Sequence, residues 1–484
     1  MTTTNTSRRN LLKGAATLAA AAPFAGALQA LSVRQARADV PAGPVPSPYG
    51  PIAPVADLAT GLPLLQLPAG FQYKSFSWIG DPMENGQPVP TRHDGMGVIE
   101  VRQGRGGREF VLVRNHEAAA TPTIIDAPAK FDTVAFANGN RVGGGTTTLY
   151  VPQGVGQPVR TVPSLGGTRT NCAGGVTPWG TWLTCEENTA DDTPAGGQKH
   201  GYVFEVTSDP LDTTGAPIRD MGRFKHEAVA FDPRTGAAFL TEDNSSGSAY
   251  YRFLPNDAAQ RAGALAAGGR LQAARVRGTT NLDIRQPQLG DVHELEWVEI
   301  ATPDSPTVGG LSGPYRQARD AGALRMGRGE GIWHHDGKLY VVDTSAGAAG
   351  QGAVWEHDLR ADTLRCIYVS PDAAVANNPD NLTVSPRGGL VLCEDGGRST
   401  DAYGEGSRLL GLHGEGVAYI FAKNNVVLED AALAALGKNV AGGDYRSSEF
   451  CGACFDPSGH YLFVNIQSPG ITLAIWGPWA RGTI

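Results

Sequence analysis

The chain repeats one pattern of apolar and polar positions six times. In each copy an acidic or thiol residue opens an apolar run, the run crosses a Gly-centred turn, and it closes on a polar cluster, usually 13 to 16 residues later. Two apolar runs joined by a tight turn predict an antiparallel β-hairpin. The start of the first strand and the end of the second lie at the same edge of a hairpin. We therefore expect the opening and closing residues to meet in space.

The opening and closing positions are mostly carboxylates, amides and thiols. The opening residues are Asp94, Cys172, Glu227, Glu330, Asp380 and Cys451. The closing clusters are Asn115 to Glu117, Glu186 and Glu187 with Asn188, Glu242 and Asp243 with Asn244, Asp343, Glu394 with Asp395, and Asn465 with Gln467.

Six hairpin units spread over about 390 residues predict an all-β fold, a six-bladed β-propeller over residues 91–484. A β-sandwich or a β-solenoid is the alternative, but sandwiches rarely repeat one hairpin six times and solenoids have shorter, more even spacing. Two long excursions, 255–325 and 423–445, contain Ala-rich stretches at 257–274 and 428–436 that are typical of helices. We expect these excursions to be lid-like insertions over the polar edge. Residues 39–90 lack clear periodicity and are expected to form an extended arm.

The first 38 residues have the features of a twin-arginine export signal. Arg8 and Arg9 precede an apolar stretch from residue 15 to 31, and 36–38 reads Ala-Arg-Ala, a cleavage site. The stretch is rich in Ala and Gly and is soon interrupted by arginines, which argues against a membrane span. We expect the twin-arginine export machinery as a partner and a periplasmic or secreted location.

Charge and cysteine content narrow the function classes. Removal of residues 1–38 takes away five basic residues and no acidic one, so the formal charge changes from −8 to −13. Such an acidic protein is not expected to bind nucleic acid, and we expect a monomer. The six cysteines are spread through apolar runs of a chain large enough to bury a core, so we expect no disulfide framework.

So many acids at one edge would repel one another, which implies a cationic occupant. Two charges 4 Å apart repel by roughly 4 kcal/mol at an effective dielectric of about 20. Only Arg328, and Arg114 less clearly, lies within the repeated clusters, so metal ions are the better counter-charge. Oxygen ligands suit Ca²⁺, whereas the thiol of Cys172 favours a softer or more Lewis-acidic metal such as iron or zinc. Each acid alone could equally be a solvated strand end; the repeat favours a shared site.

Taken together and in order, the motifs resemble those of the PhoX family of bacterial alkaline phosphatases. They are Arg114-Asn115-His116-Glu117, Asn171-Cys172-Ala173-Gly174-Gly175, Cys185-Glu186-Glu187-Asn188, Gly222 to Glu227 (GRFKHE), Thr241-Glu242-Asp243-Asn244, Gly327-Arg328-Gly329-Glu330-Gly331, Pro379-Asp380-Asn381-Leu382, Cys393-Glu394-Asp395-Gly396 and Phe463-Val464-Asn465-Ile466-Gln467. The similarity covers nearly the whole chain after the signal.

The resemblance implies a propeller channel with a cluster of Fe³⁺ and Ca²⁺ that hydrolyses small phosphate monoesters. Cys172 would be an iron ligand, and Glu117, Glu227 and Glu330 would share the ligation of iron and calcium. The acids Glu186, Glu187, Glu242, Asp243, Asp380 and Glu394 would complete the calcium sites. Arg328 would grip the phosphoryl oxygens and act with Glu330 in catalysis, and Asn115 would help bind the substrate. A calcium-dependent lactonase or esterase and a non-catalytic calcium-binding propeller are the alternatives.

Overall fold

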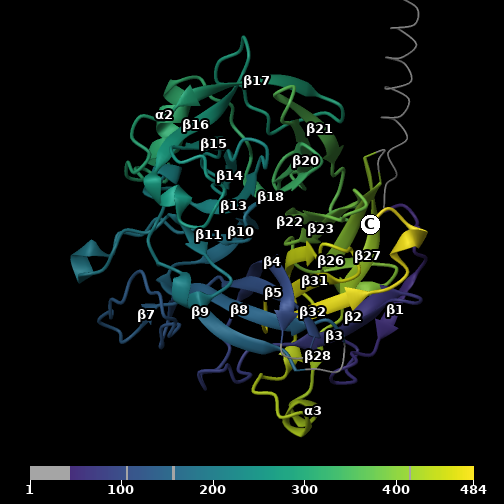
Figure 1. The fold of residues 1–484 in the computed structure, drawn as a ribbon. Helices are drawn as coiled ribbons and strands as arrows, with labels where there is room; N and C mark the ends of the chain where they lie inside the picture. Colours follow the sequence, from purple (N-terminus) through teal and green to yellow (C-terminus); the bar gives the residue numbers. More distant parts are fainter. Residues whose placement is uncertain (1–43, 105–106, 155–157, 414–415) are drawn as a thin grey trace, which may run out of the picture. The chain divides into compact units, whose positions relative to one another are not determined.

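The computed structural model describes residues 44–104, 107–154, 158–413 and 416–484. The expected export signal, residues 1–38, lies outside this part. The described chain is all-β, with sheets arranged like the blades of a propeller and few helices (Figure 1). Its α-helices are α2 (Gly313–Asp320) and α3 (Asp430–Ala435). Among the described residues, no helix has the length and apolarity needed to cross a membrane.

Five sheets of three or more strands are present in the described part of the chain. The first has the order β4 (His93–Gly104), β5 (Gly107–His116), β8 (Gly144–Pro152), β9 (Arg160–Thr168). The second has the order β10 (Asn171–Val176), β11 (Trp182–Glu186), β12 (Val203–Val206). The last has the order β3 (Gln72–Phe76), β32 (Ile471–Trp476), β31 (Leu462–Ile466), β30 (Phe450–Phe455).

The two larger sheets lie between these along the chain. The nine-stranded sheet has the order β13 (His226–Phe231), β14 (Ala238–Glu242), β15 (Tyr250–Pro255), β16 (Gly269–Val276), β17 (Val292–Glu299), β21 (Thr363–Val369), β20 (Ala353–Asp358), β19 (Lys338–Asp343), β18 (Gly329–His335). The six-stranded sheet has the order β1 (Ile52–Val55), β2 (Leu65–Pro68), β27 (Val417–Asn424), β26 (Arg408–His413), β23 (Leu390–Glu394), β22 (Pro379–Val384). Three two-stranded ribbons, β6 (Ala120–Thr121) with β7 (Arg141–Val142), β24 (Ser399–Asp401) with β25 (Gly404–Gly406), and β28 (Val427–Leu428) with β29 (Gly443–Asp444), lie in the loops.

The first strands of the six predicted hairpins contact one another in a closed ring. β4 contacts β10, β10 contacts β13, β13 contacts β18, β18 contacts β22, β22 contacts β30, and β30 contacts β4. Most of these strands are labelled near one another at the centre of Figure 1. Small residues permit this approach: a Cβ on Gly95 would lie 2.5 Å from the Cα of Ala173, and one on Gly175 would overlap the carbonyl of Val229. Glycine at such positions lets two backbones come close.

Every inner hairpin carries a register shift beside the polar edge. Five inner strands pair through their first residue with the last residue of the second strand, and the pairing then shifts by one residue. β30 shows the same shift one pair later, after Cys451. Such a β-bulge turns a side chain away from its regular direction and is common beside active sites. The bulge therefore repeats with the hairpin, and in five of the six units it carries the opening residue.

Two expectations need correction. Six separate sheets are not observed, because β17 pairs with β21 and joins the third and fourth hairpin units into the nine-stranded sheet. The helix expected over 257–274 is also wrong: this stretch contains a single 3-10 turn, Ala264–Ala267, followed by β16. Gly263 and Gly268, at φ of 81° and 70°, bracket the turn in conformations that end a helix. The second expected helix is confirmed as α3.

Residues 44–90, for which we expected an extended arm, contain three strands of the main sheets. β1 and β2 extend the six-stranded sheet, and β3 pairs with β32. Tyr49 and Phe71 from this segment pack edge-to-face with one another and on Phe421 and Trp479 from the last part of the chain. All six cysteines are free, which confirms the absence of a disulfide framework.

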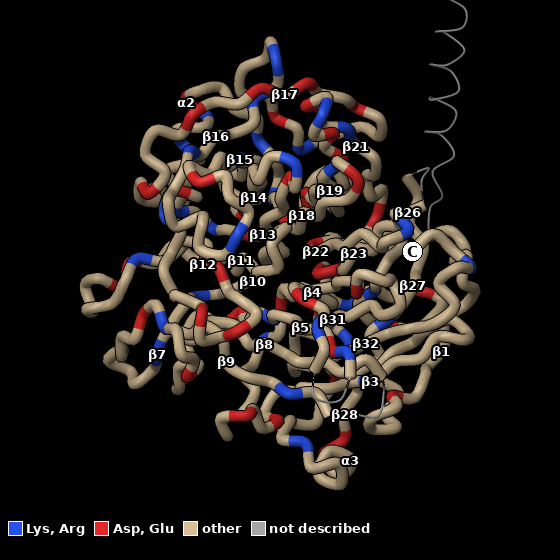
Figure 2. Tube along the Cα trace, in the orientation of Figure 1, with Lys and Arg blue, Asp and Glu red and all other residues tan. Residues whose placement is uncertain are grey.

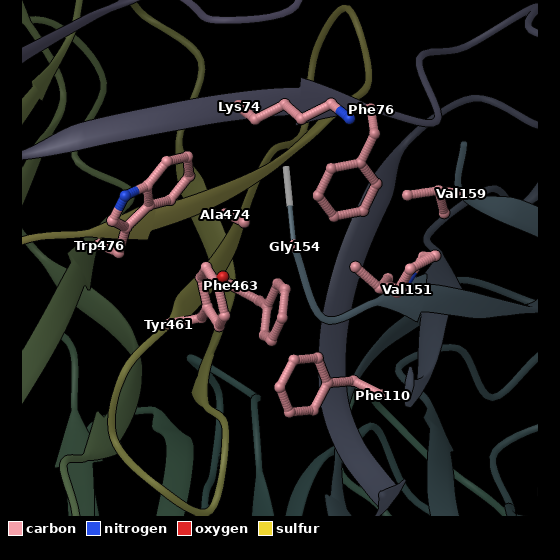
Figure 3. A pocket seen from close by; sticks show the side chains of 11 residues that line it. Lys74, Phe76, Phe110, Val151, Gly154, Val159, Tyr461, Phe463, Ala474 and Trp476 are labelled. Atoms are coloured by element: carbon pink, nitrogen blue, oxygen red, sulfur yellow. The ribbon is translucent and has the colours of Figure 1, made fainter. Parts of the chain in front are cut away.

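An aromatic pocket lies at the seam between the last sheet and the first (Figure 3). Phe76 on β3, Phe463 on β31, Trp476 on β32 and Phe110 on β5 point into it. Its volume is about 30 Å³, enough for one or two water molecules. It is a small aromatic pocket at the closure of the ring.

Replacement of Tyr73 by Phe should weaken the attachment of β1 and β2. The buried Tyr73 hydroxyl accepts hydrogen bonds from the amides of Leu64 and Leu65 and donates to the carbonyl of Val55. Its loss strands buried backbone groups, so we expect the free energy of unfolding to fall by about 1–3 kcal/mol in urea titrations. Tyr445→Phe, which removes an exposed hydroxyl bonded to Ala441, is the control and should change stability by less than about 0.5 kcal/mol. Equal effects of the two variants would contradict this role.

Candidate functional site

Three positions of every hairpin face the same mouth of the ring. The opening position is the second residue of the inner strand; the exit position follows the second strand; the leading position precedes the inner strand. The exit residues are Glu117, Glu187, Asp243, Thr344, Asp395 and Gln467, and the leading residues are Arg92, Thr170, Lys225, Arg328, Asn378 and Glu449. In all six units the exit amide donates to the leading carbonyl, over 2.9–3.3 Å. This repeated bond brings the three positions of each unit together.

The structure brings five of the ten predicted ligands into three adjoining groups. In each group, one ligand atom from every residue lies within 4.8 Å of the others. The groups are Cys172, Glu187, Glu227; then Glu227, Glu330, Asp380; then Asp380, Asp395, Glu449. Glu227 belongs to the first two groups and Asp380 to the last two. The side chains thus form one continuous cluster, which we call the acid ring, and acidic segments gather around β22, β23 and β4 in Figure 2.

The electrostatics of the acid ring are strongly unfavourable without a cation. Burial, and then the charges of neighbouring carboxylates, hold the pKa values of Asp94, Glu227, Glu330, Asp380 and Glu449 well above their usual range. The same causes raise the pKa of Glu187 to about 8. Burial, Asp94 and Glu227 raise the pKa of the Cys172 thiol. Desolvation and like charge both disfavour ionisation, so the cluster needs positive charge to stay ionised.

The residues fit metal ions. The Cys172 Sγ lies 3.2 Å from Glu227 Oε1 and 3.9 Å from Asp94 Oδ1, so thiol and carboxylates converge on one point. The other Glu227 oxygen is buried without a hydrogen-bond partner, which is costly unless a cation occupies that side. A thiolate with carboxylates at one end suits a transition metal, and the all-carboxylate groups suit hard cations such as Ca²⁺.

Cationic side chains lie on the rim of the acid ring. Arg328 is held by a two-pronged ion pair, with Nε 2.6 Å and Nη2 2.5 Å from the Asp243 carboxylate, and its Nη2 lies 3.2 Å from Glu330 Oε1. Because Asp243 supplies the strongest bond, the pKa of Arg328 is raised and the group stays charged. About a third of its side chain is exposed. A guanidinium held in this way can present its remaining N–H groups to an oxyanion.

Three predicted ligands, Glu186, Glu242 and Glu394, do not reach the acid ring. Each is the last residue of its strand, and successive side chains of a strand point to opposite sides. Glu186 accepts from the amides of Arg169, Gly201 and Tyr202 and from His200. In this structure these three acids therefore point away from the acid ring, and their ligand role stays a prediction.

Glu394 and Asp343 have the same orientation. Glu394 forms a fully buried ion pair with Arg408 and accepts from the amide of Asn377. Asp343 accepts from the amides of Gly327 and Arg328. Glu242 accepts from the Tyr251 hydroxyl. These acids anchor backbone that supports the acid ring.

Asn115 was predicted to bind substrate, but the structure places it elsewhere. Its amide group donates to the carbonyls of Cys172 and Ala173, and its oxygen accepts from Trp182 and Thr184. All of these partners are within the protein, and the side chain is buried. Asn115 therefore fixes the strand that carries Cys172 and has no group free for a substrate.

The metal ligands that the resemblance implies do not include Asp94, Asp395 or Glu449. The signal was present, because Asp94 occupies an opening position, Asp395 an exit position, and Glu449 lies two residues before Cys451. The Gln467 side-chain amide joins Asp94 to Glu117, because it donates a hydrogen bond to each carboxylate. Cys451 is buried and its thiol lies 3.0 Å from the His93 carbonyl, in keeping with a packing role.

A second cluster, Asp132, Asp192 and His200, lies outside the acid ring. Arg169 forms a two-pronged bond with Asp192, and His200 bridges Glu186 and Asp132 at 2.7 and 3.3 Å. Burial alone would lower the pKa of His200, but Glu186 and the other neighbouring acids raise it above its usual value. Arg169 and His200 therefore offset part of the negative charge of these acids.

Comparisons with known proteins agree with this geometry. The solved structure of Pseudomonas fluorescens PhoX in complex with vanadate, a transition state analogue, is 18% identical, covers 92% of this chain and 99% of its own, and superposes with a TM-score of 0.63. At this identity the match shows a shared fold. Virginiamycin B lyase from Staphylococcus aureus (11% identity, 84% and 99% coverage, TM-score 0.33) and a protein of unknown function from Dyadobacter fermentans (9%, 86% and 100%, 0.41) are more distant. No curated protein matches the chain.

The family description "Alkaline phosphatase PhoX" matches residues 47–159 and 146–470, which is most of the chain. These matched ranges include every residue of the acid ring. The chain therefore belongs to the PhoX family of alkaline phosphatases, metal-dependent enzymes that hydrolyse phosphate monoesters.

Proposed function

We propose that this phosphatase hydrolyses small phosphate monoesters at the acid ring. The convergence of a thiol, buried carboxylates and the anchored Arg328 on one mouth of the strand ring carries the proposal. A calcium-binding scaffold or a calcium-dependent lactonase would need neither the thiol nor the guanidinium beside Glu330. The substrate class follows from the family, and the geometry supports the residue roles that we propose.

Fe³⁺ and Ca²⁺ are the proposed metals. Cys172 with Glu227 and Glu187 would hold iron, with Asp94 adjacent, and Glu330, Asp380, Asp395 and Glu449 would hold calcium. The metals would polarise the phosphoryl group and offset the charge that develops on it. Glu117 lies next to this set, bonded through Gln467 to Asp94.

Arg328 is the proposed phosphoryl-binding residue. Asp243 fixes the guanidinium from one side, which leaves its outer edge toward the mouth. Planar N–H groups can pair with two phosphoryl oxygens and stabilise the charge on them in the transition state. Glu330 shares this arrangement, because its carboxylate lies 3.2 Å from Arg328.

Three wider expectations remain proposals. The closed ring of six inner strands supports a six-bladed propeller over residues 91–484 in which the third and fourth blades share one sheet. The insertions at 255–325 and 423–445 are proposed as lids, and in the first of them the Gly310 carbonyl accepts a hydrogen bond from Asn244, next to the exit residue Asp243. Arg8 and Arg9 support export by the twin-arginine route to the periplasm or medium.

Cys172→Ala should remove iron and phosphatase activity together. We expect loss of bound iron by elemental analysis and a fall in hydrolysis of p-nitrophenyl phosphate of about 100-fold or more. Cys185→Ala, a buried core thiol on the next strand, is the matched control and should keep its iron. Full activity of the wild-type protein after complete removal of iron and calcium would refute the proposal.

Arg328→Met should lower kcat by about 100-fold, because it removes donors to the charged transition state. Steady-state kinetics with p-nitrophenyl phosphate measure the effect, and Arg328→Lys should recover only part of it because it lacks the two-pronged geometry. Arg252→Met removes a cation that stacks on Trp297, away from the acid ring, and is the control. Unchanged kcat in Arg328→Met would exclude the assigned role.

The metal-stripped protein should lose stability as the pH rises. Glu187 keeps its proton up to about pH 8 in the folded state but releases it near pH 4.5 when unfolded. The folded state therefore binds more protons across this window, and its free energy of unfolding falls with rising pH. We expect a loss on the order of a few kcal/mol between about pH 5 and pH 8.5 in urea titrations, and a smaller loss with metals bound. Equal stability of the stripped protein at both pH values would contradict this.

A further inference from the structure

The six leading positions form a second ring of side chains around the mouth. Their carbonyls accept the same hydrogen bond in every unit, so the six side chains start from equivalent points. In order around the ring they are Arg92, Thr170, Lys225, Arg328, Asn378 and Glu449. Their chemistry is uneven, although their backbone positions match.

Positive charge occupies one side of this ring. Arg92, Lys225 and Arg328 occupy three of four consecutive leading positions. The other two positions are Asn378 and the acidic Glu449, which is next to Arg92 as the ring closes. Arg328 is held closely by Asp243. Arg92 and Lys225 flank the uncharged Thr170 and define what we call the basic arc.

The two cations of the basic arc have loose attachments. Lys225 Nζ lies 3.3 Å from Glu187, and 43% of its side chain is exposed. Arg92 donates to Gln467 over 2.7 Å, but its Nη2 is 3.9 Å from Glu117 and 47% of the side chain is exposed. Each head group therefore retains N–H donors that face solvent at the mouth.

Backbone strain marks three of the six leading positions. Arg92, Thr170 and Asn378 have φ of 55°, 49° and 49°, a left-handed conformation that residues other than glycine seldom adopt. Thr is β-branched, so its conformation is especially unusual. Strained residues of this kind cluster at ligand sites, where the surrounding structure maintains them.

Lys225 ends in an ammonium group, and lysine side chains are ordinarily charged at neutral pH. The Arg92 guanidinium is charged at any ordinary pH. Both groups can thus bind an anion under the conditions in which the enzyme works.

Resting on the proposed function, we propose that Arg92 and Lys225 bind a second anionic group on the alcohol part of the ester. The reacting phosphoryl group would lie at Arg328, one position along from Lys225, and the alcohol would extend over the rim. On the other side of the ring the leading positions are Asn378 and Glu449, which offer no cation to an anionic group. The site would therefore favour monoesters whose alcohol carries a carboxylate or a second phosphate.

A matched pair of substrates tests this. 3-Phosphoglycerate and glycerol 1-phosphate differ in having a carboxylate or a hydroxymethyl group beside the same ester. The kcat/KM for 3-phosphoglycerate divided by that for glycerol 1-phosphate is measured on the metal-loaded enzyme. This ratio should fall about fivefold in Lys225→Met and in Arg92→Met, because each variant loses one half-exposed ion pair with the carboxylate. Lys225→Arg should keep the ratio, and Arg252→Met should leave it unchanged.

Other outcomes overturn the proposal. An equal loss for both substrates, or a loss of bound metal in Lys225→Met, would assign Lys225 to charge balance for Glu187. A ratio unchanged in both Met variants would remove the basic arc from recognition. If the wild-type enzyme hydrolyses neither ester nor p-nitrophenyl phosphate, the proposed function itself fails, whereas a wild-type enzyme that hydrolyses both with an insensitive ratio refutes only the anion site.

Discussion

Repulsion among buried carboxylates is the constraint on which the arrangement of this molecule depends. Charges a few ångströms apart repel by several kcal/mol even at a moderate dielectric, and burial together with neighbouring carboxylates raises the pKa values of Asp94, Glu227, Glu330, Asp380 and Glu449. Side chains on flexible loops would move apart. Here the backbone bond between exit and leading positions, repeated six times, prevents this. The scaffold thus keeps a set of carboxylates close together. Their mutual approach becomes favourable only when cations lie between them.

A second layer of acids makes this rigidity possible. Glu186, Asp343 and Glu394 are each adjacent in sequence to an exit residue, yet they point away from the mouth and accept bonds from backbone amides. Their charge is satisfied by fixed donors, and in Glu394 by the buried Arg408. In these hairpins the last residue of the second strand anchors the backbone, and the exit residue that follows it faces the mouth.

Much of this was predictable from the periodic pattern, and the remainder has definite physical reasons. The hairpins, their shared edge and the gathering of Cys172, Glu227, Glu330 and Asp380 follow from alternation and turn placement. The pattern could not separate Glu186 from Glu187, because a one-residue difference in register decides which faces the ring. The pairing of β17 with β21 joins strands far apart in the sequence, which the periodic pattern does not reveal. The helix expected over 257–274 does not form because Gly263 and Gly268 adopt conformations that end a helix. Asn115 was mistaken for a substrate residue because its partners, Trp182 and Thr184, belong to a different sheet.

The last sheet combines β3, from residues 72–76, with β30, β31 and β32, from residues 450–476. This sheet is complete only when strands about 400 residues apart in the chain have paired. Because the acid ring takes side chains from five units, between Cys172 and Glu449, it can form only after the chain up to Glu449 has been made. The enzyme can therefore bind all of its metal ions only after the chain has been made and the ring has closed.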